Sequence, residues 1–178
     1  YSYGDYDYFG DHGTHVAGIV GAAANGTGMV GVAPKATLVN FGIFDDNGWS
    51  PTGHGQDALA WVVGQGASVV NMSYGSTTAG QVFLSLNEIA TLASYNDELV
   101  VVRAAMNAGM NLKSQPLPSG VGLGDLDHIL IVGSVDSANK ISSFSNKPGN
   151  SCWGGFLTIC SSSAKIMNSF IVAPGQSI

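Results

Sequence analysis

Residues 99–105 read LVVVRAA, and this run decides how the chain is expected to fold. Three valines in succession favour a strand over a helix, and a near-continuous apolar run is typical of a strand buried on both faces. Similar runs occur at 37–44 (TLVNFGIF), 68–73 (SVVNMS) and 128–135 (HILIVGSV). The sequence therefore predicts several short buried strands rather than alternating, half-exposed ones.

Segments with helical character separate these runs. Residues 13–24 are rich in Ala, Gly and Val, while 55–64 and 82–95 carry apolar residues at helical spacing. Strands that alternate with helices predict an α/β fold in three layers, with a mainly parallel sheet and helices on both faces. The predicted core comprises Val39, Ile43, Val69, Val70, Val100, Val101, Val102, Ile131 and Val132.

Composition excludes several classes of protein. The chain has 178 residues, of which 45% are hydrophobic and 10% charged, and its formal net charge is −6. The apolar fraction argues against a disordered chain, and six basic residues argue against a nucleic-acid partner. No apolar run is long enough to predict a membrane-spanning segment. Low charge with abundant Gly, Ser and Asn is typical of secreted or cell-surface proteins.

The two cysteines, Cys152 and Cys160, lie in a Gly- and Ser-rich stretch. A disulfide across this short loop is feasible, and the alternative is a pair of unrelated thiols. Two cysteines without a nearby histidine are too few for a structural zinc site, so the sequence predicts no metal there.

The most informative stretch for chemistry is DHGTHVAG at 11–18. A histidine at the start of a helix, followed by small residues, can present its ring as a general base for a hydroxyl nucleophile. His12 and His15 are alternatively metal ligands or surface histidines, since the spacing alone is weak and the glutamate of an HExxH motif is missing. From the residues alone these alternatives stay open.

The motif HGTHVAG at 12–18 resembles the catalytic-histidine motif of the subtilisin-like serine proteases, the subtilases. Further segments resemble motifs of that family in the same order. They are VGVAPKATL at 30–38, ASVVNMSYG at 67–75, LVVVRAAMNAG at 99–109, IVGSVDSANKISSFS at 131–145 and VAPG at 172–175. The resemblance implies a serine endopeptidase that acts on polypeptides through an acyl-enzyme.

Carried over by motif, the resemblance makes His12 the general base and Asn107 the side-chain donor of the oxyanion hole. His15 is expected to be structural. Ser73, Tyr74 and Gly75 would line the pocket for the substrate side chain before the scissile bond, the S1 pocket. The segment 48–51 is expected either to pair with an extended substrate or to be a solvated turn.

Two members of the catalytic triad are not found. Subtilases use Asp, His and Ser in that chain order, yet Asp5, Asp7 and Asp11 are not on a plausible buried strand, and no GTS motif follows 172–175. Residues 1–178 are therefore expected to be a partial subtilase domain that begins after the catalytic Asp and ends before the catalytic Ser. The partner it then needs is the missing part of its own protease domain.

Three further positions depart from the family pattern. Met106 stands where the family usually has glycine, which predicts a partly filled S1 pocket or a tilted loop, and Arg103 is expected to be buried with a carboxylate partner. Residues 148–170 form an insertion with both cysteines, a feature that resembles subtilases of bacterial autotransporters. An alternative function is therefore an inactive subtilase-like module that binds peptides.

The resemblance also suggests a calcium site in the loop Asn25–Met29. Calcium takes six to eight oxygen ligands, and Asn25 supplies one side-chain oxygen. The sequence thus predicts no certain cofactor, and calcium remains open.

Overall fold

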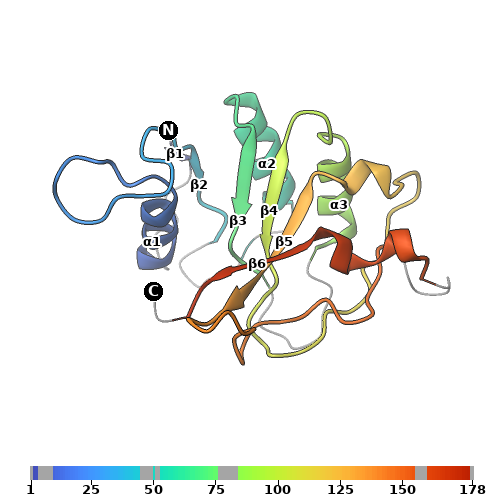
Figure 1. The fold of residues 1–178 in the computed structure, drawn as a ribbon. Coiled ribbons are helices and arrows are strands. Elements are labelled where there is room, and N and C mark those ends of the chain that lie inside the picture. The colour runs from blue at the N-terminus through green and yellow to red at the C-terminus, as the bar shows by residue number, and fades with distance from the viewer. Residues whose placement is uncertain are drawn as a thin grey trace. The chain divides into compact units, whose positions relative to one another are not determined.

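The computed structural model of the chain describes residues 2–3, 10–44, 50, 53–75, 84–154 and 160–176 (Figure 1). It divides into two compact units, residues 1–67 and residues 68–178, and each is described here by itself. The division falls immediately before the strand predicted at 68–73.

The first unit contains helix α1 (Gly10–Gly21), helix α2 (His54–Gly64) and a short parallel pair of strands, β1 (Ser2–Tyr3) and β2 (Asn40–Phe41). Helix α1 begins three residues earlier than predicted and also ends earlier. The chain returns across its end, where Gly31, Val32 and Ala33 donate backbone hydrogen bonds to α1 or the residue after it, at 2.8–2.9 Å. These bonds satisfy carbonyls that a helix end leaves open.

Small residues on α1 permit close packing. A Cβ on Gly18 would lie 3.5 Å from the sulfur of Met29, and one on Gly21 would lie 3.2 Å from Leu38. Helix α2 buries Leu59 and Val62, and its Trp61 packs edge-on against Phe41 of β2 with ring centroids 5.7 Å apart.

The second unit is built on a four-stranded parallel sheet in the order β3-β4-β5-β6. The strands are β3 (Val69–Met72), β4 (Val100–Ala104), β5 (Ile129–Val135) and β6 (Phe170–Pro174). Figure 1 shows them side by side, and every pairing between described strands is parallel. The parallel sheet predicted from the apolar runs is confirmed.

Helix α3 (Leu86–Ala93) precedes β4, and the described residues of the unit also form three short 3-10 helices: η1 (Gly124–Leu126), η2 (Ser162–Ala164) and η3 (Ile166–Ser169). A capping box starts α3: Glu88 N–H donates to Ser85 Oγ at 3.1 Å, and Ser85 N–H donates to Glu88 Oε2 at 2.8 Å. The helix was predicted over 82–95, of which Val82 and Phe83 lie outside the described residues.

The core of the second unit includes Ile89 and Leu92 of α3, Val101 of β4 and Ile131 of β5, each fully buried. Strand β5 alternates strictly between buried and half-buried residues, so one face of the sheet is buried more completely than the other.

Two predicted core residues are wrong. Val69 is 60% exposed and Val100 is 42% exposed. Each opens its strand, and the two are partners in the register between β3 and β4. Apolar composition predicts that a strand is buried, but it does not locate where along the strand the cover begins. Ile43, Val101 and Ile131 are buried as predicted, and Val39, Val70, Val102 and Val132 are half-buried.

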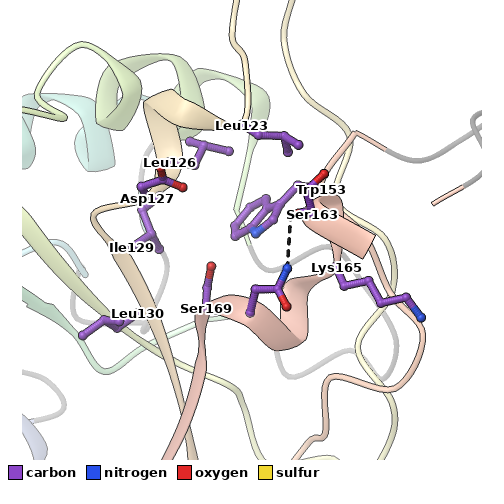
Figure 2. Close-up of a pocket in the computed structure, with 10 residues that line it drawn as sticks. Leu123, Leu126, Asp127, Ile129, Leu130, Trp153, Ser163, Lys165 and Ser169 are labelled. Carbon is purple, nitrogen blue, oxygen red and sulfur yellow. Dashed lines mark hydrogen bonds between the residues drawn. The ribbon is translucent and has the colours of Figure 1, made fainter. Parts of the chain in front are cut away.

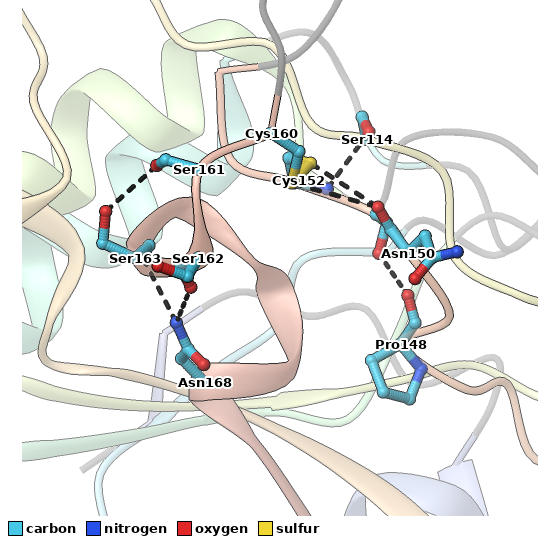
Figure 3. Close-up of a disulfide and its surroundings, with 10 residues drawn as sticks. Ser114, Pro148, Asn150, Cys152, Cys160, Ser161, Ser162, Ser163 and Asn168 are labelled. Atoms are coloured by element: carbon cyan, nitrogen blue, oxygen red, sulfur yellow. Dashed lines mark hydrogen bonds between the residues drawn. A yellow bond between two sulfur atoms is a disulfide. The ribbon is translucent and has the colours of Figure 1, made fainter.

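The segment 148–170, predicted to be an insertion, is paired through its backbone in its described part. Cys152 O accepts a hydrogen bond from Gln115 N–H at 2.8 Å, and Trp153 N–H donates to Ala164 O at 2.8 Å. Cys152 and Cys160 form the predicted disulfide, with their Cα atoms 5.9 Å apart (Figure 3). The insertion thus joins the extended segment before η1 to the segment that leads into β6.

Candidate functional site

The candidate site lies where β3 and β4 end. The register pairs Met72 with Arg103, an offset of 31 residues, so its continuation places Gly75 opposite Met106. Parallel strands present their carboxyl ends at one edge of a sheet, and open α/β sheets bind ligands at that edge. The structure therefore brings together the residues predicted at 73–75 and at 106–107.

Met106 contacts Gly75 directly. A Cβ built on Gly75 would collide with the sulfur of Met106, would lie 2.8 Å from its Cε, and would lie 3.1 Å from Nη2 of Arg103. The space beside Gly75 is thus occupied by the methionine side chain. Met106 also has a φ of 75°, a left-handed conformation that costs a non-glycine residue about 1–3 kcal/mol.

Arg103 and Tyr74 pack against each other at this edge of the sheet. Arg103 is 2% exposed, its Nη1 donates to Met72 O at 3.3 Å, and its guanidinium lies 4.5 Å from the centre of the Tyr74 ring. Burial holds the pKa of Arg103 below its usual value, and electrostatic interactions with Tyr74 and Glu88 oppose this fall. The sequence predicted a carboxylate partner. Glu88 is a carboxylate that acts on Arg103 electrostatically, and a carbonyl and a ring are among the groups that contact the guanidinium.

Burial also raises the pKa of Tyr74 to about 12, although the Arg103 charge opposes the rise. The phenol is therefore neutral over the pH range in which proteins are ordinarily active. Beside it, Ser73 Oγ exchanges hydrogen bonds with the side chain of Asn71 at 2.9 and 3.1 Å. The three residues after β3 are thus oriented by their neighbours.

Asn107 is exposed on the loop Met106–Met110, here named the Asn107 loop. The segment after β5 restrains this loop through backbone hydrogen bonds: Gly109 N–H donates to Phe144 O at 2.6 Å, and Lys147 N–H donates to Met110 O at 2.9 Å. Asn146, which is 7% exposed, accepts from Ala108 N–H and from Met110 N–H at 3.1 Å each.

The sequence interpretation missed Asn146. The stretch 142–155 is rich in polar residues and glycine, yet Ser142, Ser145 and Asn146 are all buried. Polar residues are buried when their hydrogen bonds are satisfied, which composition does not reveal. A family-like motif ending one residue before Asn146 was the available signal.

His12 lies in the first turn of α1 and is exposed, as is His15. The prediction that His12 stands near the start of a helix is confirmed. Because α1 belongs to the first unit and Asn107 to the second, it remains a prediction that His12 and Asn107 act in the same catalytic site. Asp5 and Asp7 lie outside the described residues, as does most of the predicted edge segment 48–51.

The predicted calcium loop has little to offer an ion by itself. Asn25 Oδ1 accepts a hydrogen bond from Thr27 N–H at 3.0 Å, so its side-chain oxygen is used within the loop. Among the described residues, no three or more His, Cys, Asp or Glu side chains gather as a metal site would require. The calcium site therefore stays a prediction, and no step of the chemistry is assigned to it.

A cavity of about 180 Å³ lies at the opposite end of the sheet (Figure 2). Leu126, Ile129 and Trp153 line it together with Lys165 and Ser169. Ile129 opens β5 and Ser169 immediately precedes β6, so the cavity is at the amino ends of the strands. It is therefore separate from the edge that carries Gly75 and Met106.

No helix among the described residues is long and apolar enough to cross a membrane.

Comparison with known proteins identifies a family. The model of the Subtilase family matches residues 1–177. The thermophilic serine proteinase of Bacillus sp. (strain AK1) is 32% identical over 151 residues, which cover 82% of this chain and 35% of that protein. Subtilisin DY of Bacillus licheniformis is 33% identical over 136 residues, which cover 76% of this chain and 47% of that protein. The chain thus spans between a third and a half of these relatives.

Solved structures agree in fold. A psychrophilic subtilisin-like protease from the Antarctic Pseudoalteromonas sp. AS-11 is 29% identical with a TM-score of 0.62, covering 92% of this chain and 32% of that one. The patellamide maturation protease PatA is 25% identical with a TM-score of 0.66, covering 94% of this chain and 54% of that one. With the parallel sheet, these likenesses confirm the predicted three-layer α/β fold class.

Proposed function

The chain belongs to the subtilase family, and from this premise we propose that it is part of a serine endopeptidase. The observation that carries the proposal is the pair of loops at the carboxyl ends of β3 and β4, where an exposed Asn107 stands beside the Gly75–Met106 contact. This arrangement can hold a peptide carbonyl next to an amide donor. Its substrates are polypeptides.

In the proposed reaction His12 takes the proton from a serine hydroxyl as the oxygen bonds to the scissile carbonyl carbon. Asn107 donates a hydrogen bond to the negative charge that develops on the carbonyl oxygen. His12 then gives the proton to the leaving amine as the peptide C–N bond breaks. Water hydrolyses the acyl-enzyme by the same steps in reverse order.

The serine and the aspartate that orients His12 are proposed to lie outside residues 1–178. In support, the chain matches less than half of its relatives' length, and no GTS motif occurs within it. Residues 1–178 are then a partial domain that needs the rest of its own protease domain for activity. Ser73, Tyr74, Gly75 and Met106 are proposed to bound the S1 pocket.

A fluorophosphonate probe tests this proposal on the full-length protein. We expect covalent labelling of a serine beyond residue 178, and loss of labelling in the His12→Ala variant. The matched control is His15→Ala, which removes an exposed histidine one turn further along α1 and should label normally. Equal labelling of both variants would rule out His12 as the base.

The second candidate, an inactive peptide-binding module, is favoured by one observation. The Met106 side chain occupies the space beside Gly75, where a substrate side chain would otherwise enter. A folded full-length protein that binds peptides but takes up no probe would establish this alternative.

We propose further that the protein is secreted or at the cell surface. The Cys152–Cys160 disulfide supports an oxidising compartment, and a relative, 31% identical, is named minor extracellular protease Epr of Bacillus subtilis (strain 168). The autotransporter resemblance stays a prediction.

A further inference from the structure

Asn146 holds the Asn107 loop on both sides of Asn107. Its backbone N–H donates to Met106 O at 3.0 Å, directly before Asn107. Its side-chain Oδ1 accepts from Ala108 N–H, directly after Asn107, and from Met110 N–H, both at 3.1 Å. One buried residue therefore makes three hydrogen bonds to the backbone around an exposed side chain.

Asn146 is itself fixed to the sheet. Ser145 Oγ accepts from Ser134 N–H of β5 at 2.9 Å and donates to Asn146 O at 3.0 Å. Ser145 is 1% exposed. A continuous chain of hydrogen bonds thus runs from β5 through Ser145 and Asn146 to the Asn107 loop.

The Asn107 loop needs such support because it is strained. Met106 has a φ of 75°, and strained residues persist only when their surroundings over-determine them. Asn107, Ala108 and Gly109 are all exposed, so burial does not hold the loop. Hydrogen bonds from the segment 144–147 are the restraints that the structure shows.

We propose that Asn146 is a positioning residue that holds Asn107 in the orientation required to donate to the reacting carbonyl oxygen. The inference rests on the proposed function, in which Asn107 is the oxyanion donor. A donor that must reorganise during the reaction stabilises the transition state less than one already in place. Asn146 therefore acts on the rate of the chemical step through Asn107.

A double-mutant cycle in the full-length protease tests the proposal, using a peptide substrate to obtain kcat and KM. Asn107→Ala should lower kcat by about 10²–10³-fold, the loss known for an oxyanion donor of subtilisin. Asn146→Ala should lower kcat by about 10–100-fold with little change in KM, because misplacement by about 1 Å can cost 10²-fold. In the Asn107→Ala background, Asn146→Ala should have almost no further effect on kcat.

The matched control is Asn168→Ala. Asn168 Nδ2 donates to the backbone carbonyls of Ser162 and Ser163 at 2.9 and 3.2 Å, so its loss also frees a loop, at the other end of the sheet (Figure 3). We expect it to lower the melting temperature without lowering kcat. A merely structural role for Asn146 would give the same result as this control.

The outcomes distinguish failure of the proposed function from failure of the positioning role of Asn146. If Asn107→Ala leaves kcat unchanged, or if the full-length protein is inactive, the proposed function fails and the role of Asn146 fails with it. If Asn107→Ala lowers kcat but Asn146→Ala does not, or lowers it equally in both backgrounds, only the positioning role is overturned.

Discussion

Asparagine side chains brace loops at both ends of the parallel sheet, and they use opposite ends of the amide. At the carboxyl ends, Asn146 Oδ1 accepts from two backbone N–H groups, whereas near the amino end of β6, Asn168 Nδ2 donates to two backbone carbonyls. Each bond of this kind stabilises a protein by about 1 kcal/mol. The hydrogen bonds made by the two asparagine side chains are therefore expected to stabilise the protein by similar free energies.

The loops that they hold differ in what they present. The Asn107 loop contains a left-handed methionine and an exposed Asn107, whereas the loop held by Asn168 forms η2 and lies beside a disulfide that adds its own restraint. Strained residues cluster at functional sites, whereas a disulfide stabilises a fold mainly by constraining the unfolded chain. The comparison predicts that one end of the sheet carries activity and the other carries stability.

The largest expected effect on stability comes from the disulfide end. Replacing both Cys152 and Cys160 by serine opens a loop with a sequence separation of 8, for which loop entropy predicts a loss of about 2.5 kcal/mol. Urea denaturation of the full-length protein measures this loss. We expect kcat to stay the same for the fraction that remains folded.

Reduction of the unmodified protein with a thiol is the companion experiment, and it should reproduce the shift in urea midpoint. A fall in kcat that accompanies the loss of the disulfide would contradict the division of roles, because it would show that this end also supports the chemistry.

A smaller effect is expected at the carboxyl ends from Met106→Gly. Glycine adopts the φ of 75° without strain, and loss of the side chain opens the space beside Gly75. Peptides with a large apolar residue before the scissile bond should gain about 10-fold or more in kcat/KM relative to peptides with alanine there, since a single methylene group in a hydrophobic pocket is worth about 10-fold.

Met106→Ala is the control that separates the two consequences. It opens the same space but keeps a side chain at a left-handed position, so it should change selectivity as glycine does and be less stable by about 1 kcal/mol. Unchanged selectivity in both variants would show that Met106 does not bound the pocket for that side chain.

The sequence predicted the elements whose signal is local. The apolar runs at 99–105 and 128–135 became β4 and β5 within one residue at each end, and the disulfide formed as expected. The interactions that define the site are not local. Asn146 reaches residues 36 and 38 positions away, and Met106 meets Gly75 through strand register. No composition or periodicity encodes such pairings.

The last expected effect is confined to alkaline pH and concerns Tyr74, which follows the end of β3. Its pKa is about 12 in the folded protein and 10.0 in an unfolded chain, so the unfolded state loses its proton first as the pH rises. The unfolded state then binds fewer protons than the folded one, and the free energy of unfolding falls between about pH 10 and 12. Below pH 10 both states keep the proton, and Tyr74 adds no pH dependence.

Tyr74→Phe keeps the ring over Arg103 and removes the titrating group. The difference in unfolding free energy between the two proteins should therefore be constant below pH 10 and shift in favour of phenylalanine above it. If the free energy of unfolding changed equally with pH in both proteins across this range, the Tyr74 phenol would be open to water. The burial of Tyr74 against Arg103 would then have to be revised.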